Sequence, residues 1–146
     1  MDVKPEPAAV SPLYVELHRW RTLPFVWGRS DCCLCASDWI QRVTGRDPAA
    51  AIRELYDSRA SCQALTGWMT DPVAAVERQL ATIGGLPRVE TAQRGDVAVL
   101  RLPGQRWAFG AVYLGRHWAC RAEGGVTILS PTMVQVAAIW ELGYEG

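Results

Sequence analysis

The sequence contains few histidines, only two in 146 residues, and no excess of either charge. Fifteen basic and fifteen acidic residues give a formal net charge of zero at pH 7. A neutral chain without a basic block has no electrostatic attraction to nucleic acid or to anionic lipid. We therefore expect no nucleic-acid partner.

Long apolar runs are also missing. None approaches the ~20 residues that a membrane-spanning helix needs. Residues 1–7 lack the apolar core of a signal peptide. We expect no membrane span and a chain that folds in a cytoplasm.

Five cysteines are present, and three of them lie together at Cys32, Cys33 and Cys35. This odd number does not indicate a disulfide framework, so we expect free thiols. The C-C-x-C spacing matches no standard zinc or iron–sulfur pattern. We predict no metal or cofactor, and a site that adds Cys62 or Cys120 to the cluster is the weaker alternative.

Seven tryptophans are a high load for this length. Large aromatic side chains are enriched both in cores and at binding interfaces. Four of them are candidates for a groove or an interface, although the sequence alone does not separate that role from burial. These candidates are Trp27, Trp68, Trp118 and Trp140.

Helix signals dominate residues 11–85, after an expected flexible or partner-ordered arm at residues 1–10. Ser11 and Pro12 predict the start of a helix of about ten residues. Asp31 predicts the N-cap of a second helix that ends at Gly45. Further helices are expected over residues 47–56, 58–66 and 71–83.

Strand signals follow Pro87, at residues 96–100, 107–114, 117–122, 126–129 and 137–142. A two-residue turn at 115–116 would place Ala111 opposite Cys120 and Phe109 opposite Ala122. Asp96 is expected to bind turn amides. Residues 11–146 thus predict one α+β domain, with N-terminal helices packed on a C-terminal antiparallel sheet of about five strands.

The stretch Phe25-Val26-Trp27-Gly28-Arg29-Ser30-Asp31-Cys32-Cys33 predicts a tight turn that leads into the second helix. Cys32 would then lie in the first helical turn, where free N–H groups and the helix dipole stabilise a thiolate. Cys32 is therefore the candidate nucleophile. Asp31, the residue before it, is a candidate site residue as well, although N-capping alone is enough to explain an aspartate at this position.

Three motifs in this order resemble the NlpC-like papain-fold cysteine peptidases: Trp27-Gly28 ahead of Asp31-Cys32, then Arg94-Gly95-Asp96-Val97, then Val112-Tyr113-Leu114-Gly115. Over residues 20–142 the chain resembles the compact phage and prophage members encoded among tail-tip genes. The resemblance implies a papain-like fold with Cys32 at the nucleophile position. In active members, a histidine near the start of the strand ending in Y-L-G is the base, and a polar residue on the next strand orients it.

The histidine is missing where the resemblance expects it, because residues 107–110 contain no proton acceptor. His117 is the candidate substitute. However, it would lie five positions from Phe109, about 16 Å at ~3.3 Å per residue, unless the turn falls elsewhere. His18 is expected on the polar side of the first helix.

We therefore expect a structural or assembly protein of a phage or prophage tail tip, built on an inactive peptidase fold. Its partners would be hub and distal-tail proteins, in the host cytoplasm during assembly and then in the virion tail. The alternative is an active cysteine endopeptidase that cleaves cell-wall peptides during phage entry. A cysteine-ligated metal or iron–sulfur protein is the weaker alternative.

Overall fold

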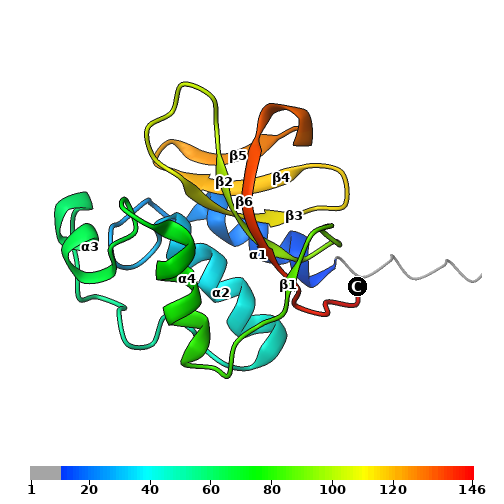
Figure 1. Ribbon diagram of the computed structural model, residues 1–146. Coiled ribbons are helices and arrows are strands. Elements are labelled where there is room, and N and C mark those ends of the chain that lie inside the picture. Colours follow the sequence, from blue (N-terminus) through cyan, green and yellow to red (C-terminus); the bar gives the residue numbers. More distant parts are fainter. Residues whose placement is uncertain (1–10) are drawn as a thin grey trace, which may run out of the picture.

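The computed structural model describes residues 11–146, so the arm expected at residues 1–10 lies outside the described residues. Four helices come first, and Figure 1 shows them gathered against the sheet that follows. They are α1 (Pro12–Thr22), α2 (Cys32–Thr44), α3 (Arg59–Thr66) and α4 (Pro72–Ala81). The strands are β1 (Arg88–Val89), β2 (Val97–Arg101), β3 (Phe109–Tyr113), β4 (Trp118–Ala122), β5 (Gly125–Leu129) and β6 (Gln135–Trp140), with a 3-10 turn at Pro131–Met133.

The strands form one open antiparallel sheet in the order β1-β6-β2-β3-β4-β5. The predicted α+β class is confirmed, with one strand more than the five expected. The additional strand is β1, whose two residues pair with the end of β6. Two residues are too few to produce an alternating hydrophobic pattern.

The β3–β4 hairpin has the predicted register. Val112 pairs with Ala119 and Tyr113 with Trp118. The N–H of Leu114 donates to the carbonyl of His117 at 2.8 Å, which closes the turn. His117 is therefore exposed at the turn, as its position in the sequence predicted.

The predicted starts of four helices and the predicted end of α2 are confirmed by their caps, whereas α4 ends at Ala81, before the predicted residue 83. The side chains of Ser11, Asp31, Ser58 and Asp71 each accept a backbone N–H in the first turn of a helix. Gly45 ends α2 in the left-handed conformation. Because both kinds of cap act within a few residues, the sequence was sufficient to locate them.

The helix predicted over residues 47–56 is wrong, because this segment forms successive turns. Glu54 has a φ of 62°, which an α-helix does not accommodate. Its N–H donates to the carbonyl of Gly28 at 2.9 Å instead of to a helical carbonyl. A contact with the turn before α2 therefore replaces the helix.

The sheet separates two apolar cores. Trp20, Trp39 and Trp140 are fully buried on the helix side, with Trp140 at 0% exposure. Trp118 is 2% exposed in the core on the opposite face of the sheet. The suggested surface role of Trp118 and Trp140 is therefore corrected to packing.

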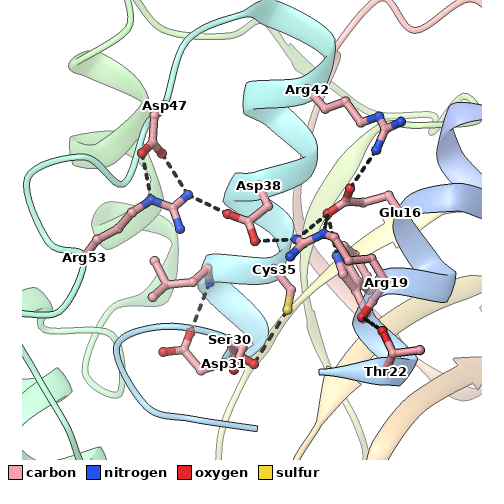
Figure 2. Close-up of polar contacts among 12 residues, drawn as sticks. Glu16, Arg19, Thr22, Ser30, Asp31, Cys35, Asp38, Arg42, Asp47 and Arg53 are labelled. Atoms are coloured by element: carbon pink, nitrogen blue, oxygen red, sulfur yellow. Dashed lines mark hydrogen bonds and ion pairs between the residues drawn. The ribbon is translucent and has the colours of Figure 1, made fainter. Parts of the chain in front are cut away.

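A chain of ion pairs fixes α2 against its neighbours (Figure 2). One oxygen of Asp38 on α2 lies 2.6 Å from Arg19 of α1, and the other lies 2.7 Å from Arg53. Arg53 also pairs with Asp47 at 2.7 Å. On the opposite side of α2, Trp39 donates its indole N–H to the Gly95 carbonyl at 2.8 Å. These contacts hold the middle of α2 against α1, the 47–56 segment and the loop before β2.

The loop before β2 is fixed by Asp96, which is 1% exposed. Its carboxylate accepts the N–H of Gln93 at 2.8 Å and that of Leu142 at 3.1 Å. The expectation that Asp96 binds turn amides is confirmed.

Candidate functional site

The turn before α2 requires glycine at position 28. Gly28 has a φ of +84°, and a Cβ added there would lie 2.0 Å from the carbonyl oxygen of Tyr56. The turn is closed by Ser30, whose hydroxyl accepts the N–H of Val26 at 3.0 Å and donates to the carbonyl of Pro24. The chain therefore enters α2 in one defined direction.

Asp31 is 1% exposed, and donors occupy both of its carboxylate oxygens. One oxygen accepts the N–H of Leu34 at 3.0 Å. The other accepts the N–H of Gly28 at 3.0 Å and the hydroxyl of Tyr56 at 2.6 Å. Asp31 thus joins the turn, the helix and the 47–56 segment, and it is structural in this arrangement.

Cys32 is the first residue of α2 and lines a cleft of about 420 Å³. The walls come from the turn before α2, from α3, and from the strands and loops of β2 to β5. Three further cysteines line the same cleft: Cys33, Cys62 and Cys120. The structure thus brings four of the five thiols to one cleft.

Among these thiols, only Cys32 has a lowered pKa. The Cys33 thiol, with its sulfur 3.9 Å away, lowers the pKa of Cys32 by hydrogen bonding, and backbone bonds from Gly110 and Cys33 add to this effect. Burial and the charge of Asp31 act in the opposite direction but are outweighed. The pKa of Cys33 is raised well above its usual value by the same pair interaction and by burial.

The remaining thiols are poor nucleophiles. Burial raises the pKa of Cys35 to about 12 and that of Cys120 to about 12. It also raises the pKa of Cys62. Since the thiolate is the reactive form, thiol chemistry in this cleft belongs to Cys32.

The strand position that faces Cys32 is Gly110. A Cβ built on Gly110 would lie 3.6 Å from the carbonyl oxygen of Cys32, so the strand approaches the helix through backbone alone. His117 and His18 instead line a separate groove, and neither is among the residues that line the cleft. The structure therefore does not bring His117 to Cys32.

Arg121 is a cleft residue that the sequence analysis missed. Extending the hairpin register from Val112 and Ala119 places Arg121 opposite Gly110, where the family resemblance expects the orienting polar residue. The side chain is 5% exposed, and Nη1 donates to the carbonyl of Trp20 at 2.9 Å. Its Nε has no partner within residues 11–146. The register already predicted from the turn could have indicated this residue.

Tryptophans and an arginine frame the mouth of the cleft. The guanidinium of Arg59 lies 5.9 Å from the ring centroid of Trp27 and 6.0 Å from that of Trp107. Trp68 is 7% exposed and donates its indole N–H to the carbonyl of Ala108 at 3.1 Å. Of the four tryptophans proposed for a groove, Trp27 and Trp68 line this cleft.

Two further properties follow from the described part of the chain. Within residues 11–146, no three or more His, Cys, Asp or Glu side chains are grouped so that they could hold a metal ion. None of the helices in this range has both the length and the apolarity needed to cross a membrane.

The fold and site define an α+β protein with an open antiparallel sheet and a cysteine at the helix N-terminus that borders its cleft. A family model matches residues 10–142, and the chain belongs to that family, described as a domain of unknown function (DUF6950). No curated protein and no solved structure gives a significant match to the chain. The resemblance to NlpC-like peptidases stays a prediction.

Proposed function

We propose that this chain is an assembly component of a phage or prophage tail tip, built on a papain-like domain that does not turn over peptide substrates. Its partners would be hub and distal-tail proteins, met in the host cytoplasm and retained in the virion. The assignment to tails rests on the motif resemblance around Trp27-Gly28, Asp31-Cys32 and Val112-Tyr113-Leu114-Gly115.

The main support for an inactive domain is that Gly110 lies opposite Cys32. A cysteine hydrolase needs a base within about 3 Å of its thiol, or one water away, and the same group protonates the leaving amine. Gly110 provides only backbone there, and both histidines line another groove. Loss of this general acid–base step costs a factor of about 10² to 10⁴ in rate.

The test is complementation in a lysogen or phage from which the gene has been deleted. We expect deletion to remove complete tails, as seen by electron microscopy of the particles. We expect Cys32→Ser to restore tails as well as the unaltered gene does, because an assembly role does not need the thiol. Normal tails in the deletion strain would refute the assembly role.

The second candidate is the cell-wall endopeptidase, and the lowered pKa of Cys32 in an open cleft favours it. Digestion of purified muropeptides, followed by mass spectrometry, tests it directly. Product that appears with the unaltered protein but not with Cys32→Ser would establish hydrolysis. Particles with complete tails that carry Cys32→Ser but infect poorly would point the same way.

A further inference from the structure

A groove of about 590 Å³ lies between α1 and the β3–β4 turn, and it shares no lining residue with the cleft at Cys32. Its polar walls are His18 and Arg21 from α1 and Arg116 and His117 from the turn. Both histidines of the chain therefore meet at one place, although 98 residues separate them. We call this surface the histidine–arginine groove.

The arginines of this groove are unusual because they lack partners. Within residues 11–146, ten of the fourteen arginines donate a hydrogen bond or form an ion pair. The four exceptions are Arg21, Arg101, Arg106 and Arg116, and Arg106 stacks on Trp107. Among residues 11–146, no carboxylate lines the groove. Two unpaired arginines thus give this surface a positive charge that residues 11–146 do not neutralise.

Additional positive charge lies beside the groove. Arg94 stacks over Tyr14 at 5.3 Å, and its carbon atoms lie within 4.0 Å of the position a Cβ on Gly115 would take. The nitrogens of Arg94 donate to the hydroxyl of Ser11 at 3.0 Å and to an oxygen of Gly146, the last residue of the sequence, at 2.9 Å.

The walls between the charges are apolar. Leu17, Leu114 and Ile128 line the groove, and Ile128 is 44% exposed. Nucleic acid and lipid headgroups are bound by broad basic surfaces, whereas this chain has no net charge. A short peptide with carboxylates for the cations and an apolar side chain for the aliphatic wall complements both features.

We propose that the histidine–arginine groove binds an acidic segment of a partner protein, with carboxylates on Arg21 and Arg116 and an apolar side chain against Leu17 and Ile128. Exposed complementary charges mainly raise the association rate and the specificity, and they weaken as salt increases. The inference does not depend on the chemistry of Cys32.

The experiment uses the full-length protein and a fluorescent octapeptide of alternating glutamate and leucine, measured by fluorescence polarisation at low and at physiological salt. We expect the double variant Arg21→Gln/Arg116→Gln to bind about three- to tenfold more weakly, as expected for the loss of two exposed ion pairs. The matched control Arg29→Gln/Arg101→Gln removes two charges elsewhere and should bind within twofold of the parent.

Equal weakening by both arginine double variants would overturn the proposal, because it would reflect overall charge. So would a glutamine–leucine octapeptide that binds as well as the acidic one, or no binding of the acidic peptide at low salt. Tighter binding of a single-stranded oligonucleotide or of phosphatidylglycerol vesicles would also overturn it. Cys32→Ser should bind the peptide as the parent does, whatever the tail complementation shows.

Discussion

Neutralising Asp31 tests whether this residue holds the turn, the helix and the 47–56 segment together. In Asp31→Asn one side-chain oxygen remains, and it can keep the N–H of Leu34. The amide group then faces two donors, the N–H of Gly28 and the hydroxyl of Tyr56. The hydroxyl can rotate and accept from the amide, but the backbone N–H cannot.

The expected cost follows from that stranded donor. A buried donor left without an acceptor costs about 1–3 kcal/mol, and a hydrogen bond to a charged group contributes about 1.5–3 kcal/mol. Because the remaining oxygen and the Tyr56 hydroxyl keep some of these hydrogen bonds, we expect Asp31→Asn to lower the free energy of unfolding by about 2–4 kcal/mol.

Urea denaturation followed by tryptophan fluorescence measures the loss, and Asp71→Asn is the matched control. Asp71 also caps a helix, but it is exposed and accepts only the N–H of Ala74 at 3.0 Å. Since asparagine caps about as well as aspartate, the control should change stability by less than about 0.5 kcal/mol. Equal losses in the two variants would refute the role assigned to Asp31.

A second readout is independent of stability. The charge of Asp31 raises the pKa of Cys32, so its removal should lower that pKa further. The pH dependence of iodoacetamide labelling should therefore shift to lower pH in folded Asp31→Asn. A shift to higher pH would contradict the assigned electrostatics. If Asp31→Asn does not fold, Tyr56→Phe removes one of the same bonds and should cost about 1.5–3 kcal/mol.

Three further outcomes are expected. Gly28→Ala should lower the free energy of unfolding by about 2–4 kcal/mol in urea denaturation, because it combines a positive φ with a backbone clash. Gly110→Ala should stay within about 1 kcal/mol of the parent. Equal losses in the two variants would contradict the contacts described. Iodoacetamide at pH 7 should label Cys32 first, by peptide mass mapping, and earlier labelling of Cys35 or Cys120 would contradict their raised pKa values. Burial raises the pKa of Asp47, but the hydrogen bonds from Arg53 and from the N–H of Ala49 together lower it by more. The net shift of the Asp47 pKa is therefore downward. Ionised Asp47 therefore stabilises the folded state above the ordinary aspartate pKa, and this stabilisation is lost as the pH falls through the pKa of the folded state. Asp47→Asn should consequently lose less stability than the parent between pH 5 and pH 2. If Asp47→Asn and the parent lost the same stability over this pH range, the downward shift assigned to Asp47 would be wrong.

The local features of the fold could be predicted from the sequence because each depends on a few neighbouring residues. Ser11, Asp31 and Gly45 cap helices through bonds that reach only three or four positions along the chain. The turn at residues 115–116 likewise fixes the whole β3–β4 register, since strand pairing has a period of two.

Features that depend on distant segments could not be predicted in this way. Residues 47–56 have an N-terminal helix signal, but Glu54 bonds to Gly28 and the helix is lost. Trp118 and Trp140 have the same side chain as Trp27, and only the sheet determines which of them are buried. The histidine–arginine groove also requires the fold, because α1 and the β3–β4 turn are far apart in sequence.

The contacts around Cys32 explain every part of its motif except the sulfur. Gly28 and Asp31 stabilise the turn and the helix in any case. The Cys32 side chain is only partly buried, and its sulfur has Cys33 as its side-chain neighbour at 3.9 Å, so serine would fit the same place. Stability therefore does not account for a thiol here. On the proposed function, in which Gly110 stands where the base would be, a Cys32 thiolate would add once to an electrophile but would not turn over amide substrates efficiently. Iodoacetamide should accordingly form one thioether per chain at Cys32, with release of iodide, while muropeptide assays measure released product.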